Sequence, residues 1–186
     1  MLVNAHKRAA WLLLIPCLSL AGAPPAPAPA TPSVEVTGAL PKTGKLALKD
    51  LEAMKPEKAA WTDRGKQVEV EGVPLGKVLA AFGFEPGPMD RGGPPANKRP
   101  GYKKVVLVTA RDGFQSVFSC AELAEEMGPA TRALLVWKVD GKPFPPEQGP
   151  FRLVVLTDKE ASRSTWAVEK IDVLDLRARG PAPARP

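Results

Sequence analysis

The sequence has few of the residues that usually carry nucleophilic, acid–base or zinc chemistry. Its 186 residues include one histidine, His6, and two cysteines, Cys17 and Cys120. Residues 1–23 have the pattern of a secretory signal, and once they are removed the chain keeps no histidine and one cysteine. A Ser-His-Asp or Cys-His mechanism, a zinc site of histidine and cysteine, and an intrachain disulfide are then excluded. The sequence also lacks a nucleotide-phosphate motif and internal repeats.

The N-terminal segment indicates export. A basic head with Lys7 and Arg8 precedes an apolar run over residues 11–20, and small residues follow up to Ala23. The apolar run is too short to span a bilayer as a helix. We therefore expect a signal peptide cleaved near Ala23 and a periplasmic or secreted protein. Lys7-Arg8 in place of an arginine pair favours the general secretory route, which exports unfolded chains, over the twin-arginine route.

Composition divides the rest of the chain into three parts. Residues 24–33 largely alternate proline and alanine and predict a stiff, extended spacer. Residues 34–176 have the length of one domain and can bury a core. Residues 177–186 are charged at first and then rich in proline and alanine, so they predict a disordered tail.

The charge of the chain does not point to a nucleic-acid partner. Loss of Lys7 and Arg8 with the signal leaves 24 basic and 20 acidic residues, which lowers the net charge from +6 to +4. The basic residues are scattered apart from two short pairs, at 98–99 and 103–104, which are typical of solvated loop flanks. We expect no nucleic-acid partner, since an exported protein seldom meets nucleic acid.

Hydrophobic periodicity predicts a mixed α+β domain. Alternating or continuous apolar residues predict strands, and proline or capping residues before a helical period predict helices. The predicted strands cover residues 34–38, 45–48, 66–71, 103–110, 114–118, 133–139, 151–157 and 167–174. The predicted helices cover residues 49–55 and 75–82 and a segment from Ser119 to Gly128, and residues 85–101 predict a loop.

Turn and capping residues support these boundaries. The pairs Asp112-Gly113 and Asp140-Gly141 predict tight hairpin turns, because such turns need positive φ. Asp112 is accordingly interpreted as a turn former and not as an acid catalyst. Ser119, with Glu122 three residues later, predicts a capping box at the start of the third helix.

Six segments resemble, in the same order, motifs of the sulfite-oxidase-type molybdopterin-binding domain family. They are LALKDL at 46–51, VPLGKVL at 73–79, VLVTARDGF at 106–114, LLVWKVDGKPFPPE at 134–147, GPFRLVV at 149–155, and VEKIDV at 168–173 shortly after Trp166. Together they cover nearly all of residues 34–174. The resemblance implies the mixed β-sheets and short flanking helices of that fold, and molybdopterin-dependent oxidoreductase activity.

The positions that the resemblance assigns to the metal centre have changed. Catalytic members of the family bind molybdenum through a cysteine thiolate in a segment before the VPL helix, and residues 65–73 at that place contain no cysteine. Carboxylates cannot replace a soft thiolate ligand in kind. The histidine of the family's PPEHG motif corresponds to Gln148. We therefore expect a degenerate site with no catalytic and no metal-binding residue, from which molybdopterin is absent.

Four residues could still bind the phosphate of the pterin. Arg152 matches the arginine of the family's PLR motif and could form a fork with a phosphate. Lys159, Arg163 and Ser164 lie in the loop that, by resemblance, approaches the same phosphate. The alternative for each residue is a solvated loop position or a structural ion pair, and we favour this alternative for Lys159 and Arg163.

Cys120 and three tryptophans have structural interpretations beside functional ones. A helix N-terminus could make the Cys120 thiol reactive, but the family has a small apolar residue there, which favours a buried position. Trp61, Trp137 and Trp166 are large enough to anchor a core, which we favour over stacking on a ligand.

Three functions remain open at this point. The first, which the missing thiolate favours, is a degenerate domain that binds a small molecule or a protein partner without redox turnover. The second is an active oxidoreductase whose molybdenum is held only by the pterin dithiolene. The third is a non-catalytic exported scaffold. A basic pocket at Arg152 would favour the first over the third, and the sequence indicates no oligomeric state.

Overall fold

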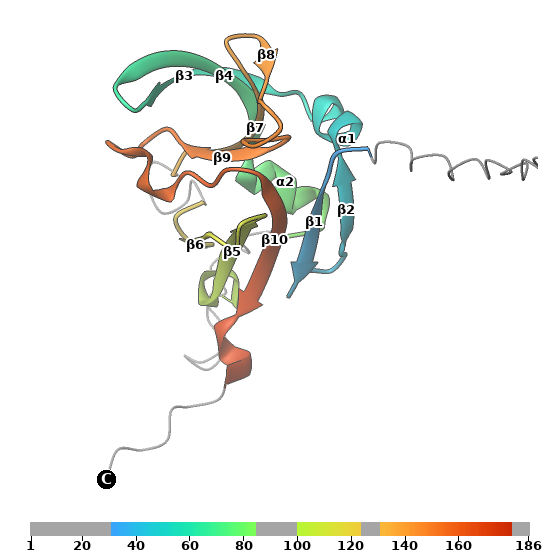
Figure 1. Ribbon diagram of the computed structural model, residues 1–186. Coiled ribbons are helices and arrows are strands. Elements are labelled where there is room, and N and C mark those ends of the chain that lie inside the picture. The colour runs from blue at the N-terminus through green and yellow to red at the C-terminus, as the bar shows by residue number, and fades with distance from the viewer. Residues whose placement is uncertain (1–30, 85–99, 124–130, 180–186) are drawn as a thin grey trace, which may run out of the picture. The chain divides into compact units, whose positions relative to one another are not determined.

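Two β-sheets make up most of the computed structural model, which describes residues 31–84, 100–123 and 131–179 (Figure 1). The first sheet has the strand order β2-β1-β10-β5-β6. β1 and β10 run parallel, and the other neighbours are antiparallel. The strands of this sheet are β1 (Ser33–Gly38), β2 (Gly44–Ala47), β5 (Lys104–Ala110), β6 (Gln115–Ser119) and β10 (Val168–Asp175).

The second sheet is centred on β7 and is antiparallel throughout. β7 pairs with β4 along one edge and with β8 and β9 along the other, while β3 pairs with the outer edge of β4. The strands of this sheet are β3 (Glu57–Asp63), β4 (Lys66–Pro74), β7 (Ala133–Val139), β8 (Lys142–Pro143) and β9 (Arg152–Val155).

Short helices flank the sheets. The helical elements are α1 (Leu48–Ala53), α2 (Leu75–Ala81) and the 3-10 turns η2 (Pro100–Lys103), η4 (Ala161–Arg163) and η5 (Leu176–Arg179). Gly83 follows the C-cap Phe82 of α2, and its φ of 77° is the left-handed conformation that commonly terminates helices. η5 occupies the start of the segment that the sequence predicts to be a disordered tail.

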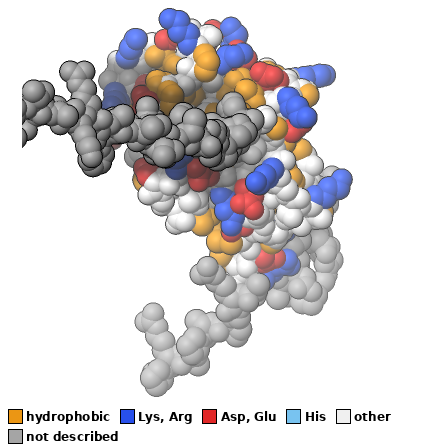
Figure 2. Space-filling view, turned by 45° about the vertical axis from the view of Figure 1, so that its right-hand side comes forward, with side chains coloured by type: hydrophobic (Ala, Val, Ile, Leu, Met, Phe, Trp, Pro, Cys, Tyr) orange, Lys and Arg blue, Asp and Glu red, His pale blue; other side chains and the backbone are white. Residues whose placement is uncertain are grey.

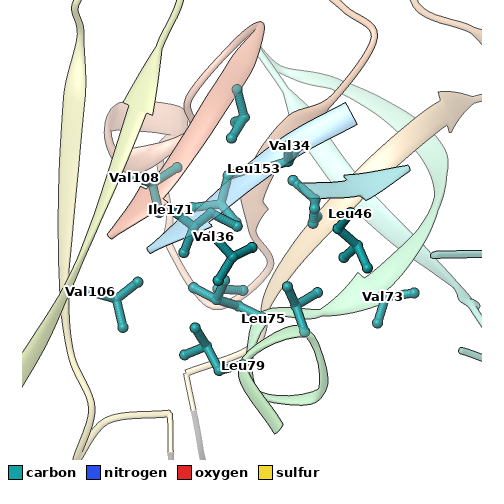
Figure 3. Packing of buried hydrophobic residues seen from close by; sticks show 14 of the residues in the cluster. Val34, Val36, Leu46, Val73, Leu75, Leu79, Val106, Val108, Leu153 and Ile171 are labelled. Atoms are coloured by element: carbon teal, nitrogen blue, oxygen red, sulfur yellow. The ribbon is translucent and has the colours of Figure 1, made fainter. Parts of the chain in front are cut away.

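The main core lies between the two sheets (Figure 3). Alternate residues of β1, β5 and β10 point inward, and they meet side chains from β4, β7, β9 and α2. Members shown in Figure 3 are Val34, Val36, Leu46, Val73, Leu75, Leu79, Val106, Val108, Leu153 and Ile171. Burial of one such aliphatic side chain contributes about 1.5–3 kcal/mol, and this cluster is the larger of the two hydrophobic clusters described.

A second, smaller cluster covers the other face of the second sheet. It consists of Trp61, Val70, Leu134, Val136 and Val154. Residues 134 and 136 alternate along β7 with residues 135 and 137, which belong to the main core. The β3–β4 hairpin curves strongly (Figure 1), and in this way Trp61 of β3 packs with residues of β7 and β9.

A β-bulge contributes to the curvature of this hairpin. The pairing of β4 with β7 shifts register between Glu71 and Gly72. A Cβ atom at residue 72 would lie 2.4 Å from the carbonyl oxygen of Leu135, so only glycine allows β4 to approach β7 so closely. Bulges increase local twist and bending, and this one closely follows Val70, through which β4 contributes to the second cluster.

Every predicted strand is present, β7 with the predicted bounds and the others with ends shifted at one or both sides, but the prediction missed β3 and the short β8. The sequence feature that could have revealed β3 is the pair Arg64-Gly65, which forms the two-residue turn between β3 and β4. The φ values of these two residues are 49° and 82°. The continuous apolar run over residues 105–108 would suggest that β5 is buried on both faces, but only one face is fully buried. Its residues alternate, so Val105 and Leu107 are only partly buried on the outer face of the first sheet.

The predicted turn and cap chemistry is largely confirmed. Asp140 and Gly141 have φ values of 48° and 73° in the β7–β8 turn. The backbone N–H of Ser119 donates to Glu122 Oε1 at 2.8 Å, which is one half of a capping box, while the Ser119 hydroxyl accepts from the N–H of Ala121. Residues 120–123 form turns instead of a regular helix, and the rest of the third predicted helix lies outside the described residues.

Other predictions also fall on residues that the structure does not describe. They are the signal peptide, most of the proline-alanine spacer, the loop over residues 85–99, and the tail beyond residue 179. Within the described ranges, no helix has the length and apolar character needed to cross a membrane.

Candidate functional site

Arg152 forms a buried ion pair with Asp63. Its side chain is 2% exposed, and its Nη1 and Nη2 atoms lie 3.0 Å and 3.3 Å from the two carboxylate oxygens of Asp63. The two N–H groups donate in parallel, which is the fork geometry that gives arginine–carboxylate pairs their strength and specificity. Arg152 lies on β9, and Asp63 is the last residue of β3.

Two indole rings enclose the guanidinium of Arg152. The Cζ atom lies 4.5 Å from the ring centre of Trp61 and 4.8 Å from that of Trp166. Both distances are within the range of cation–π attraction, which strengthens when the cation is removed from water. Arg64 stacks on Trp166 as well, at 5.0 Å, so cations and aromatic rings alternate in a short stack.

Strand periodicity explains how these residues meet. Arg152 and Val154 are two positions apart on β9 and face the second cluster, while Leu153 and Val155 face the main core. A bridge between Leu153 and Thr165 places Trp166 opposite Arg152. Trp61 and Asp63 are likewise two positions apart on β3, so one face of the hairpin supplies an indole wall and the carboxylate.

Arg163 is held by two carboxylates. Its Nη2 and Nε atoms lie 2.6 Å and 2.8 Å from the oxygens of Asp158, and its Nη1 lies 3.2 Å from Glu122 Oε2. The hydrogen bond to Asp158, followed by the bond to Glu122, raises the pKa of Arg163 above its usual range. The guanidinium also stacks on Phe118, 5.2 Å from the ring centre. Arg163 thus joins the loop after β9 to the turn after β6.

The other two predicted cofactor contacts are placed differently. Lys159 is exposed. Ser164 is 9% exposed, and its Oγ has no hydrogen-bond partner in the described part of the chain. Of the predicted contacts, Arg152 and Ser164 are therefore buried, whereas Lys159 lies at the surface.

Two buried polar atoms near the ion pair have no partner among the described residues. They are Arg152 Nε and Ser164 Oγ. Continuation of the bridge between Leu153 and Thr165 places Ser164 opposite Val154, on the same face as Arg152. A buried polar atom without a partner costs free energy. This small polar region therefore destabilises a cluster that is otherwise apolar.

The segment that was predicted to replace the metal-binding loop forms the hairpin turn and β4. Residues 65–73 run along the second sheet, and Val70 and Val73 are buried there. Gln148 lies in the turn after Pro145 and is partly buried. Among the residues that the structure describes, no group of three His, Cys, Asp or Glu side chains could hold a metal ion.

Cys120 lies in the main core and not at an exposed helix end. Its side chain is fully buried, and its backbone N–H donates to the carbonyl of Lys104 at 3.1 Å. Burial raises the pKa of the Cys120 thiol to about 11, although the nearby Lys104 opposes this shift. The thiol is therefore protonated at neutral pH, and the prediction of a buried small hydrophobe is confirmed.

The three tryptophans have distinct environments. Trp137 is 3% exposed in the main core, and Trp61 is 5% exposed in the second cluster, as expected of core anchors. Trp166 is only partly buried and stacks between two arginines.

The sequence did not identify Asp63 or Trp61 as parts of the site. Both lie on β3, the strand that the prediction missed.

The distribution of charge on the surface agrees with the expectation from composition, because basic and acidic side chains are interspersed on the face shown in Figure 2.

Comparisons with known proteins identify the fold. A family model described as the oxidoreductase molybdopterin binding domain matches residues 21–182. The crystal structure of the sulfane dehydrogenase SoxCD from Paracoccus pantotrophus is similar, with a TM-score of 0.54 and 15% sequence identity over 77% of this chain. The match covers 38% of the SoxCD chain, and at this identity it shows the fold alone. No match was found among curated proteins.

Proposed function

Because the chain belongs to the oxidoreductase molybdopterin-binding domain family, we propose that it is an exported member that keeps the fold without the catalytic metal centre. The observation that carries this proposal is the absence of cysteine from residues 65–73. The resemblance places the thiolate ligand of molybdenum in this segment, which here forms part of β4. We therefore do not expect this chain to have the molybdenum-dependent oxidoreductase activity of catalytic family members.

The described residues do not fit a molybdenum centre that needs a protein thiolate. A thiol must lose its proton to bind a metal, but the Cys120 thiol is buried in the core with a pKa of about 11. Glu69 and Glu71 of β4 each pair with a lysine instead, Lys58 and Lys138, at 2.9 Å and 3.0 Å. Carboxylates that are already paired, and that are hard ligands, are poor substitutes for a soft thiolate.

The residues also do not fit the phosphate of the cofactor in their present arrangement. Arg152 donates one N–H from each of its terminal nitrogens to Asp63, and it is buried beside two indole rings. Arg163 is neutralised by Asp158 and Glu122. A phosphate would have to displace a carboxylate at either arginine, so neither provides a ready anion site.

This arrangement favours a non-catalytic scaffold or interaction domain. A basic pocket open at Arg152 would have supported the binding of an anionic small molecule, and the 2% exposure of Arg152 argues against such a pocket in the described part of the chain. We therefore place recognition of a protein partner ahead of small-molecule binding. A molybdopterin-dependent enzyme whose metal is held only by the pterin is the alternative that the test must exclude.

Export without cofactor is part of the same proposal. The basic head and short apolar run over residues 1–23 support secretion, and Lys7-Arg8 supports transport of an unfolded chain. Transport of an unfolded chain would leave a cofactor made in the cytoplasm behind. Blocking the general secretory pathway in the producing cell should stop export, and continued export would contradict this part of the proposal.

Elemental analysis tests the central claim. The full chain and a version that lacks residues 1–23 are produced in a host that synthesises molybdopterin, with an authentic sulfite-oxidase-type enzyme as the positive control. We expect neither molybdenum nor pterin fluorescence above the background of an unrelated protein. Stoichiometric molybdenum together with electron transfer to or from a sulfite or sulfoxide would show that the chain is an active enzyme.

A further inference from the structure

We propose that Arg152 and the two indole rings beside it form a site for a small carboxylate, which the chain closes with its own Asp63 side chain. This inference rests on the proposed function, since a cofactor phosphate at Arg152 would need the position that Asp63 holds. It goes beyond that function in two ways. It assigns carboxylates as the class of ligand that the site accepts, and it explains that the site is closed because Asp63 fills it.

The geometry at Arg152 is that of a binding site for a planar anion. Nη1 and Nη2 point at two carboxylate oxygens at 3.0 Å and 3.3 Å. The indole rings of Trp61 and Trp166 lie 4.5 Å and 4.8 Å from the guanidinium, whose side chain is 2% exposed. A buried guanidinium requires a counter-anion, because an unpaired buried charge is strongly destabilising.

The two members of the ion pair differ in their access to solvent. The Arg152 side chain is 2% exposed, whereas that of Asp63 is 28% exposed. Of the pair, only the carboxylate therefore reaches water to an appreciable extent. Removal of the Asp63 carboxylate would open a space of that size between solvent and the terminal nitrogens of Arg152.

The carboxylate and the arginine lie on different strands of the second sheet. Arg152 lies on β9, which pairs with the central strand β7. Asp63 ends β3 next to the Arg64-Gly65 turn, and its carboxylate makes its hydrogen bonds to Arg152. The carboxylate can thus be deleted without changing the strand that carries the guanidinium, and Trp61 remains as a wall.

Chemical complementation tests the proposal. Asp63→Ala removes a carboxylate that is the size of formate, so sodium formate should bind to this variant. The readout is the thermal unfolding midpoint in sodium formate compared with sodium chloride at the same ionic strength. We expect formate to raise the midpoint of Asp63→Ala by several degrees in a saturable manner, and to leave the midpoint of the wild type unchanged.

Two matched variants separate charge from space. Asp63→Asn removes the charge but fills the space, so formate should not stabilise it. Asp63→Ala combined with Arg152→Met keeps the space but lacks the cation, so formate should not stabilise this variant either. Stabilisation of the double variant would show that formate acts elsewhere and would overturn the proposal.

The remaining outcomes also decide the question. A folded Asp63→Ala variant that does not respond to formate refutes the proposal, as does an equal response of the wild type. If Asp63→Ala does not fold in chloride, recovery of the folded circular dichroism spectrum in formate supports the site, and failure in both salts refutes it. Molybdenum in the wild-type protein would contradict the proposed function alone, because the formate experiment does not depend on a cofactor.

Discussion

The guanidinium of Arg111 reaches from the β5–β6 turn to the carbonyl oxygen of Gly149, which lies 3.0 Å from Nη2. Its Nη1 donates to the carbonyl of Pro146 at 3.4 Å, and its Nε lies 3.1 Å from Glu169. The turn predicted at Asp112-Gly113 thus secures the proline-rich connection between β8 and β9. This connection contains Gln148, where the resemblance places a family histidine, so the turn holds that position against β10.

Arg111→Met should therefore loosen this connection. Two hydrogen bonds to carbonyl oxygens are lost, one exposed and one partly buried, so we expect a loss of about 1–2 kcal/mol in the free energy of unfolding. Amide hydrogen exchange should accelerate at residues 148 and 149, whose N–H groups donate to the carbonyl of Pro145. Arg132→Met is a suitable control, since its pair with Glu57 is largely exposed and should contribute about 0–1 kcal/mol. Equal exchange rates in both variants would contradict the assigned role.

Loss of the cation at the centre of the indole stack should destabilise the domain markedly. Arg152→Met removes a buried fork and two cation–π contacts, so we expect a loss of about 3 kcal/mol in the free energy of unfolding. Arg152→Lys keeps the charge without the planar fork and should recover only part of this loss. The measurement is urea unfolding monitored by tryptophan fluorescence, because Trp61 and Trp166 contact the replaced side chain.

Lys58→Met provides a comparison for the buried pair. Lys58 and Glu69 have side chains that are 60% and 54% exposed, and such a pair contributes about 0–1 kcal/mol. If Arg152→Met cost no more than Lys58→Met, the buried stack would not be an important stabilising element.

Two glycine substitutions should have opposite effects on stability. Gly72→Ala places a Cβ 2.4 Å from the carbonyl oxygen of Leu135, so β4 must move away from β7 and the free energy of unfolding should fall by about 2–3 kcal/mol. Gly76 lies within α2, and a Cβ there would meet Leu123 O at 3.7 Å, an ordinary contact. Gly76→Ala should therefore stabilise the helix by about 0.5–1 kcal/mol. Chemical unfolding of both variants checks the predicted signs, and destabilisation by Gly76→Ala would show that the helix packs more tightly than its backbone indicates.

The buried thiol of Cys120 should make stability depend on alkaline pH. Burial raises the pKa of the folded thiol from 9.0 to about 11, so the unfolded state loses its proton first. The stabilisation from the buried neutral thiol is complete below pH 9 and should be lost as the pH rises from about 9 to about 11. The free energy of unfolding of the wild type, measured against pH, should fall more steeply over this range than that of Cys120→Ala. Parallel profiles would contradict the burial of the thiol, as would rapid reaction of the folded protein with a thiol reagent at pH 8.

Local chemistry accounts for the features that sequence reasoning predicted correctly. A two-residue turn between paired strands requires positive φ at its central residues, and Asp140 and Gly141 both have positive φ. The apolar residues of β7 indicate a buried strand because both of its faces are covered, one by the main core and one by the second cluster. Short-range patterns of this kind depend on a few neighbouring residues, so they can be identified without knowing which distant residues they contact.

The site was harder to predict because its partners are distant in the sequence. Asp63 and Arg152 are separated by 89 residues, and no local pattern links them. β3 was missed because Ala59 and Ala60 weaken its alternation, and its identity as a strand depends on pairing with β4. The match of Arg152 to the family's PLR motif suggested a phosphate contact, whereas in the structure the curved β3–β4 hairpin brings a carboxylate to it.

The sequence by itself determined the family, most of the strands along the chain, and the absence of cysteine from residues 65–73. These properties depend on residue types and local spacing, which a linear chain displays directly. Only the tertiary structure decided that Asp63, Trp61 and Trp166 enclose Arg152 and that Cys120 is buried with a raised pKa. The physical reason is that burial and ion pairing are set by groups that approach through space, and here the Gly72 bulge and the curved β3–β4 hairpin bring those groups together.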